Sequence, residues 1–189
     1  ADIDAAVEGA FASKYRNAGQ TCVCANRLYA QDGIYDKFVK KLAARVATMK
    51  VGSGFETGVE IGPLIEDAAV KKVAKHVADA VKKGGKVLTG GAKLKGQFFQ
   101  PTVVAEATSN MLCATEETFG PLAPLFRGIE MRACADINPA AAQARAKEYG
   151  LRAETVDGLL ASRDIDIIVN LTIPAAHYGV SRLVLDAGK

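Results

Sequence analysis

Apolar residues spaced three and four positions apart mark three helices in the first two thirds of the chain. This spacing brings the apolar residues to one face, so each helix is expected to pack on a core along that face. The helical segments are residues 3–15, 34–49 and 66–83. Short apolar runs predict strands at residues 25–31, 86–89, 98–105 and 122–126. Pro101 lies inside the third run and predicts an edge or broken strand, because proline donates no hydrogen bond to a sheet.

The pattern changes after Gly128. Residues 165–171 form a nearly continuous apolar run, which is typical of a parallel strand covered on both faces. The other elements expected in this part are a strand at 129–136 and helices at 139–149, 156–162 and 174–187. Alternating strands and helices predict an α/β fold with three layers, in which helices cover both faces of a mostly parallel sheet. We expect two domains, residues 1–128 and residues 129–189.

Composition narrows the class of protein. The chain of 189 residues is 49% hydrophobic, enough for a real core, and its net charge is only +3. That charge is too small to indicate a nucleic-acid-binding surface, and there is no run of 18 apolar residues to cross a membrane. We therefore expect neither nucleic acid nor membrane as a partner. The lysines of helix 66–83 predict a solvated face, and His76 falls on that polar face.

The cysteine and histidine content indicates a reduced setting without a metal. The four cysteines lack the spacing of a disulfide framework, and no leader segment is evident, so a cytoplasmic location is predicted. Only His76 and His177 are present, and neither has zinc-ligand spacing to the cysteines, so no metal site is predicted. The glycine-rich stretch 51–64 follows a helix rather than a strand, which favours a connecting loop over a phosphate-binding turn. The way the chain begins and ends suggests a piece of a longer protein.

One stretch carries candidate chemistry. An amphipathic run ends at Gly19, and Cys22 and Cys24 follow. A thiol at such a turn can lie near unpaired backbone N–H groups, which favour the thiolate and can hold an oxyanion. The residues alone leave two interpretations open for Cys22: an activated nucleophile or an inert packed thiol. Arg16, six residues before it, is by itself a surface charge.

Residues 17–22, Asn-Ala-Gly-Gln-Thr-Cys, resemble the nucleophile motif of the NAD(P)-dependent aldehyde dehydrogenases. Arg16 and the Cys-Val-Cys ending resemble more narrowly the succinate-semialdehyde dehydrogenases, and the resemblance runs over about residues 1–127. It implies that Cys22 is the nucleophile and that Arg16 grips the distal carboxylate of the substrate, a task suited to a guanidinium. It also implies that Cys24 acts as a redox switch that caps Cys22. The alternative for Cys24 is a packed thiol.

Glu117 and Phe119 match the Glu-x-Phe-Gly-Pro segment of the same family. The resemblance implies that Glu117 holds the nicotinamide ribose and that Phe119 packs against the ring, with NAD or NADP as cofactor. An ionised carboxylate suits this role because it accepts two hydroxyl donors at once. The general base, the side-chain oxyanion donor and the main cofactor domain of such enzymes are expected to lie upstream of this sequence.

The last third resembles a second family, that of glucose-fructose oxidoreductase and inositol dehydrogenase. This resemblance implies a Rossmann-like tail in which Asp136 binds the adenosine ribose and Thr172, Pro174 and His177 line the cofactor crevice. Asp136 is equally explained as a turn residue, and the glycine-rich phosphate turn of that family is absent from this chain. The matching residues are Ala135, Asp136, 170–174, His177 and 187–189.

Together these resemblances predict an oxidoreductase. The reaction expected is NAD(P)-dependent oxidation of a small aldehyde, succinate semialdehyde to succinate, through a thiohemiacetal and a thioester on Cys22. A homo-oligomer is expected. Two alternatives stay open: a catalytically inactive chimeric or truncated α/β protein, and an NAD-binding fragment of a sugar or inositol dehydrogenase.

Overall fold

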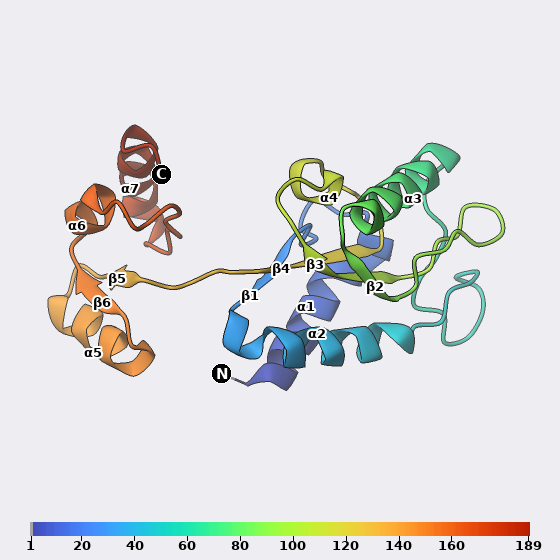
Figure 1. Cartoon of the computed structure of the whole chain (residues 1–189), viewed down its shortest axis with the longest axis horizontal. Coiled ribbons are helices and arrows are strands. Elements are labelled where there is room, and N and C mark those ends of the chain that lie inside the picture. Colours follow the sequence, from blue (N-terminus) through green and yellow to red (C-terminus); the bar gives the residue numbers. More distant parts are fainter. Residues whose placement is uncertain (1) are drawn as a thin grey trace. The chain divides into compact units, whose positions relative to one another are not determined.

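The computed structural model describes residues 2–189, which form two compact units (Figure 1). The first unit extends to Ile129, and the second runs from Glu130 to Lys189. Each unit has its own strands and helices. No helix among residues 2–189 combines the length and the apolar character needed to cross a bilayer.

The first unit is built on a four-stranded sheet. Its strands are β1 (Leu28–Ala30), β2 (Lys86–Thr89), β3 (Thr102–Ala107) and β4 (Leu122–Arg127). They lie in the order β1-β4-β3-β2, and only the β2–β3 pair is antiparallel. Leu28 lies opposite Leu125, and Thr102 lies opposite Leu122. The mostly parallel α/β sheet predicted from the sequence is confirmed for this unit.

Helices cover the sheet on both faces, which explains why nearly every residue of β3 and β4 is buried. In Figure 1, α2 and α3 lie on opposite sides of the strands, and α1 packs against α2. Leu42 and Val46 of α2 and Val70 and Val73 of α3 are fully buried in the core. The helices of this unit are α1 (Ile3–Tyr15), the 3₁₀ turn η1 (Arg16–Gly19), α2 (Asp32–Ala47), α3 (Asp67–Lys82) and α4 (Leu112–Thr115).

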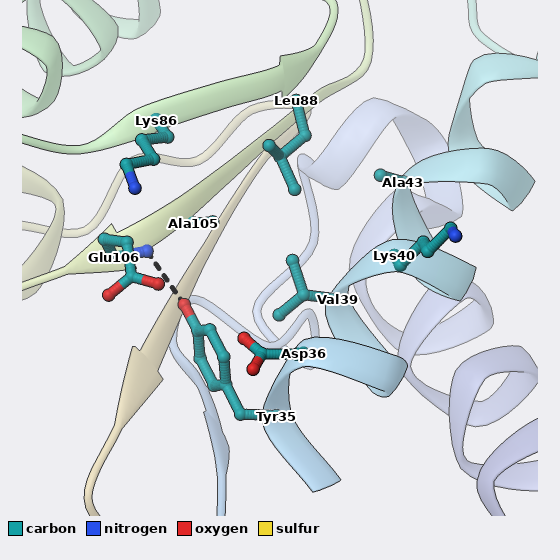
Figure 2. Close-up of a pocket in the computed structure, with 9 residues that line it drawn as sticks. All are labelled: Tyr35, Asp36, Val39, Lys40, Ala43, Lys86, Leu88, Ala105 and Glu106. Carbon is teal, nitrogen blue, oxygen red and sulfur yellow. Dashed lines mark hydrogen bonds between the residues drawn. The ribbon is translucent and has the colours of Figure 1, made fainter. Parts of the chain in front are cut away.

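Tyr35 fastens α2 to the sheet. Its hydroxyl donates a hydrogen bond to the carbonyl of Leu125 at 3.0 Å and accepts one from the backbone N–H of Glu106 at 2.8 Å. Figure 2 shows the ring rising from α2 toward Glu106, beside an open pocket of about 410 Å³. The side chain of Tyr35 thus supplies hydrogen-bond partners to backbone groups of two neighbouring strands, β3 and β4. Buried polar groups need such partners.

The second unit contains two short parallel strands joined by a helix. The signals that bound α5 are local: the side chain of Asn138 accepts from the N–H of Ala140, and Gly150 ends the helix with φ +68°. The predicted strand 129–136 is reduced to β5, and the strand β6 was not predicted. The elements are β5 (Ala133–Ala135), α5 (Pro139–Tyr149), β6 (Arg152–Glu154), α6 (Val156–Ala161) and α7 (Pro174–Asp186).

The strand predicted at residues 165–171 does not form, and this expectation was wrong. The segment is irregular, and Ile167, Val169 and Leu171 are between 74% and 88% exposed. A parallel strand is stable only when neighbouring strands pair with it and helices cover both its faces. Among residues 130–189 the structure contains only β5 and β6, which pair with each other. The apolar pattern is therefore present without the partners that would bury it.

Candidate active site

The loop that carries Cys22 makes two sharp turns. Asn17, Ala18 and Gly19 all have left-handed backbone angles, with φ of 48°, 55° and 73°. For the two non-glycine residues this conformation is strained, and such strain gathers at functional sites. The next turn is closed by the N–H of Cys24, which donates to the carbonyl of Thr21 at 3.1 Å. Cys22 lies inside this turn and is exposed, so its sulfur can be reached from solvent.

Cys24 points inward instead. It is buried, its Sγ lies 2.7 Å from Oγ1 of Thr21, and its thiol donates to the carbonyl of Arg16 at 3.5 Å. These contacts tie both ends of the loop together. All four cysteines of the chain are free thiols. The redox exchange between Cys22 and Cys24 stays a prediction. Arg16 is exposed on the same loop as Cys22.

Gln20 anchors the loop to the glycine-rich segment. Its Oε1 accepts from the N–H of Ile65 at 2.9 Å, and its Nε2 donates to the carbonyl of Pro63 at 3.5 Å. Segment 51–64 follows α2 and makes internal backbone bonds, such as that from the N–H of Gly52 to the carbonyl of Ile61. It therefore connects α2 to α3 and supports the loop at residues 16–27 that carries Cys22 (the cysteine loop).

The segment that carries Glu117 and Phe119 packs against the cysteine loop. A Cβ placed on Gly19 would lie 2.2 Å from the carbonyl oxygen of Gly120, so the two backbones are in direct contact. The N–H of Thr118 also donates to Oδ1 of Asn26 at 3.2 Å. The fold thus brings into contact the loop that carries Cys22 and the segment that carries Glu117 and Phe119, which are about a hundred residues apart in the sequence.

Glu117 is exposed at this junction, and Phe119 is partly buried with a left-handed φ of 49°. An exposed carboxylate can accept hydrogen bonds from ribose hydroxyl groups, and an aromatic ring two residues further on can pack against a flat ring. The pockets of about 410 and 460 Å³ in the first unit lie elsewhere, since neither is lined by Cys22 or Glu117.

Lys14 lies under this junction and was missed by the sequence analysis. Its side chain is fully buried, and its Nζ has no hydrogen-bond partner among the described residues. Burial lowers the pKa of Lys14 to about 8, although negative charge on Cys24 and Glu117 would act in the opposite direction. The sequence signal for its burial is its position on the apolar face of α1, seven residues after Val7 and four after Ala10.

His76 corrects a prediction. It was expected on the solvated face of its helix, but it is fully buried, whereas the lysines around it on α3 are exposed. Its Nδ1 lies 3.0 Å from Oγ1 of Thr118, and its Nε2 lies 3.3 Å from Oε2 of Glu116. Burial lowers the pKa of His76, since it disfavours the charged ring. The sequence pattern of a helix distinguishes its polar face from its apolar face. It does not show that a distant segment supplies hydrogen-bond partners that allow a polar residue to be buried.

Comparison with protein-family models decides what kind of protein this is. The model described as "Aldehyde dehydrogenase family" matches residues 1–158, which is most of the chain. The chain belongs to the aldehyde dehydrogenase family. The match passes the expected boundary at Gly128 and does not favour the interpretation of the chain as a fragment of a sugar dehydrogenase.

Several aldehyde dehydrogenases of known name are similar to the chain. It is 61% identical over 127 residues to glutarate-semialdehyde dehydrogenase of Pseudomonas putida, covering 67% of this chain and 26% of that protein. It is 54% identical over 155 residues to the NADP(+) succinate-semialdehyde dehydrogenase of Escherichia coli, covering 81% of this chain and 31% of that protein. The chain thus spans about a quarter to a third of the length of these relatives.

Solved structures agree with the family. Succinate-semialdehyde dehydrogenase from Burkholderia pseudomallei superposes with a TM-score of 0.68 at 44% identity. The alignment covers 92% of this chain and 38% of that structure. An aldehyde dehydrogenase from Brucella melitensis gives the same TM-score at 47% identity. The α/β fold with a mostly parallel sheet is therefore the fold of this family.

The predicted site residues of the second unit make local contacts. Oδ1 of Asp136 accepts from the N–H of Asn138, and Oγ1 of Thr172 donates to Oδ1 of Asn170. Pro174 is the first residue of α7. No hydrogen bond within residues 130–189 joins Asp136 to Thr172. Their cofactor roles stay predictions, as does the resemblance of this unit to the second family. No group of three metal-ligating side chains occurs among residues 2–189.

Proposed function

We propose that this chain carries the nucleophile, the anion-binding residue and part of the cofactor site of an NAD(P)-dependent aldehyde dehydrogenase. The observation that supports this most directly is the contact between two distant loops. One presents an exposed cysteine, and the other presents an exposed glutamate two residues before a phenylalanine. Members of the family use NAD or NADP. The complete activity is proposed for the full-length protein.

In the proposed reaction the thiolate of Cys22 adds to the aldehyde carbonyl and forms a thiohemiacetal. Backbone N–H groups at such a turn can hold the oxyanion that develops. When NAD(P) is bound, it supplies the hydride acceptor. Glu117 would hold the ribose hydroxyls and Phe119 would pack against the ring, which keeps the acceptor close to Cys22. Loss of the hydride leaves a thioester on Cys22. Water then hydrolyses this thioester, which releases the carboxylic acid and restores the free thiol.

Arg16 would select the substrate. The relatives' names include dehydrogenases of succinate semialdehyde, glutarate semialdehyde and 3-sulfolactaldehyde, and each of these aldehydes carries an anionic group at its far end. A guanidinium binds a carboxylate or a sulfonate with paired hydrogen bonds. We propose succinate semialdehyde as the substrate and small anionic aldehydes as the class. A homo-oligomer and a cytoplasmic location remain part of this proposal.

Alkylation of the cysteines tests the proposal. We expect iodoacetamide to modify Cys22 at least about tenfold faster than Cys113 at pH 7, because Cys22 is exposed at a turn. Cys113 is buried, which raises the pKa of its thiol. The sites are quantified by mass spectrometry after short pulses, with the half-buried Cys134 as a second internal reference. Equal rates at Cys22 and Cys134 would contradict an activated nucleophile.

Protection by aldehydes tests the substrate class in the same assay. We expect succinate semialdehyde to slow alkylation of Cys22 at about tenfold lower concentration than butanal, which has no carboxylate. Arg16→Gln should remove this difference. The matched control is Arg163→Gln, which neutralises an exposed arginine of the second unit. Equal protection by both aldehydes in the unmodified chain would argue against Arg16 as the anion-binding residue.

A further inference from the structure

His76 joins α3 to the segment that carries Glu117, and it does so through both ring nitrogens. Nε2 faces Oε2 of Glu116 at 3.3 Å, and Nδ1 faces Oγ1 of Thr118 at 3.0 Å. The two partners are the immediate neighbours of Glu117 in the sequence. The ring itself is fully buried.

The partners determine which nitrogen carries the proton. An ionised carboxylate only accepts hydrogen bonds, so Nε2 must donate to Glu116. A neutral imidazole has one N–H, so Nδ1 is the acceptor and the hydroxyl of Thr118 donates to it. A single proton therefore satisfies both contacts. A second proton on Nδ1 would remove the acceptor and oblige the hydroxyl of Thr118 to turn.

Some groups around the ring lower the pKa of His76 and others raise it. Burial disfavours the second proton and lowers the pKa of His76, and Lys72 and Lys75 of α3 act in the same direction. Glu116 favours the charged ring, and Asp79 of α3 lies close enough for the charge of His76 to lower the pKa of Asp79. Because the folded chain binds this proton less readily than the unfolded chain, the contacts are stable near pH 7 and weaken as the pH falls below about 6.5.

The geometry of the segment explains what the ring does for Glu117. Glu116 is in an extended conformation, with φ −114° and ψ 146°. In extended chain, side chains at alternate positions point to the same side. Holding Glu116 and Thr118 against α3 therefore directs Glu117 to the opposite, exposed side. Val73, one turn before His76, closes the same contact, because a Cβ on Gly120 would lie 2.5 Å from its Cγ2.

We propose that His76 is a positioning residue of this site: by binding Glu116 and Thr118 together, it holds Glu117 toward the cofactor beside the cysteine loop. The use made of Glu117 rests on the proposed function above, but the holding of the segment can be measured without any cofactor. Asn26 completes the arrangement from the cysteine loop, through its bond to the N–H of Thr118.

Hydrogen exchange on the 189-residue chain tests the proposal. We expect His76→Ala to speed exchange of the amides at residues 116–119 by about tenfold or more, because the segment loses its attachment to α3. Exchange in the middle of α2 should stay unchanged. The control His177→Ala alters the other, exposed histidine and should leave residues 116–119 unaffected. Unchanged exchange at residues 116–119 in His76→Ala would overturn the proposal.

A pH series covers the case in which the alanine variant does not fold. In the unmodified chain, exchange at residues 116–119, corrected for its intrinsic pH dependence, should rise as the pH falls from 7 to 5. In His76→Gln, whose amide can donate to Glu116 but does not titrate, the rise should be absent. NMR of the His76 ring should follow the same transition, with His177 as reference. A rise of equal size in both chains would also overturn the proposal.

Calorimetry with NAD on the full-length protein and the same variants separates this inference from the proposed function. Faster exchange in His76→Ala with unchanged NAD affinity would support the positioning role and contradict the cofactor role of Glu117. Saturable binding that is weakened about tenfold by His76→Ala and partly restored in His76→Gln would support both. Binding unchanged in His76→Ala, with unchanged exchange, would contradict the positioning role alone.

Discussion

At the scale of single residues, Lys14 is the buried charge of this structure that has no hydrogen-bond partner among residues 2–189. The pKa of Lys14 falls from 10.5 to about 8, which corresponds to about 3 kcal/mol of folding free energy at 1.36 kcal/mol per unit. The folded chain binds this proton less readily than the unfolded chain. The cost is therefore fully present below pH 8 and is relieved as the pH rises toward 10.5.

We predict that Lys14→Met stabilises the chain at pH 7 by about 1–3 kcal/mol, because methionine has a similar length and no charge to desolvate. The gain should shrink between pH 8 and pH 9.5. Urea unfolding at pH 7 and pH 9.5 measures both values, and taking the difference from the unmodified chain cancels the titration of the tyrosines and Cys113. Lys75→Met, at an exposed position of α3, should change stability by less than about 0.5 kcal/mol. A destabilised Lys14→Met would show that the ammonium has a favourable partner.

At the scale of elements, the site depends on the contact between the cysteine loop and the segment that follows α4. Gly19 makes this contact possible for two reasons: its φ is +73°, and a Cβ would lie 2.2 Å from the carbonyl oxygen of Gly120. A side chain at Gly19 would have to displace the backbone of Gly120. Backbone cannot rotate away from a clash as a flexible side chain can.

We predict that Gly19→Ala destabilises the chain by about 2 kcal/mol or more and slows alkylation of Cys22, because the two loops must separate. Gly9→Ala is the matched control. Gly9 lies in α1 with nothing within 4 Å of the added methyl group, so this change should be neutral or stabilising by up to about 1 kcal/mol. Thermal unfolding and the iodoacetamide assay measure the two effects. Equal stabilities of the two variants would show that the backbones separate freely.

At the scale of the whole molecule, the two units differ in how much apolar surface they bury. The core cluster of the first unit draws on every one of its strands except β2, and on its helices. In the second unit, the buried hydrophobic residues are Ala142, Ala146, Ile165 and Val184. Since burial of apolar area is the main source of stability, the second unit should be much the less stable of the two.

We predict that residues 130–189 unfold at a lower temperature than the first unit, in a separate transition. Calorimetry should show two transitions, and the amides of residues 166–173 should exchange within seconds because they lie outside helices and strands. Removing residues 130–189 should leave the upper transition within a few degrees of its original temperature. A single transition shared by both units would contradict this prediction.

Local signals were sufficient for most elements. The helix at residues 3–15, the strand at 86–89 and the helix at 139–149 have the bounds expected from their spacing, caps and glycines. The strand at 165–171 failed because a buried strand depends on neighbours that the pattern cannot supply. The motifs placed Cys22 and Glu117 among the candidates, but they could not place His76, whose partners lie about forty positions away.

The sequence by itself determined the longer helices, most of the strands, the family and the cysteine at the turn, because each depends on neighbouring residues or on a continuous motif. The tertiary structure alone decided that Cys22 points outward while Cys24 points inward, and that Lys14 and His76 are buried. It also decided that the two loops touch at Gly19 and Gly120. Burial and contact depend on which segments, distant in the sequence, pack against each other, and only the folded chain brings those segments together.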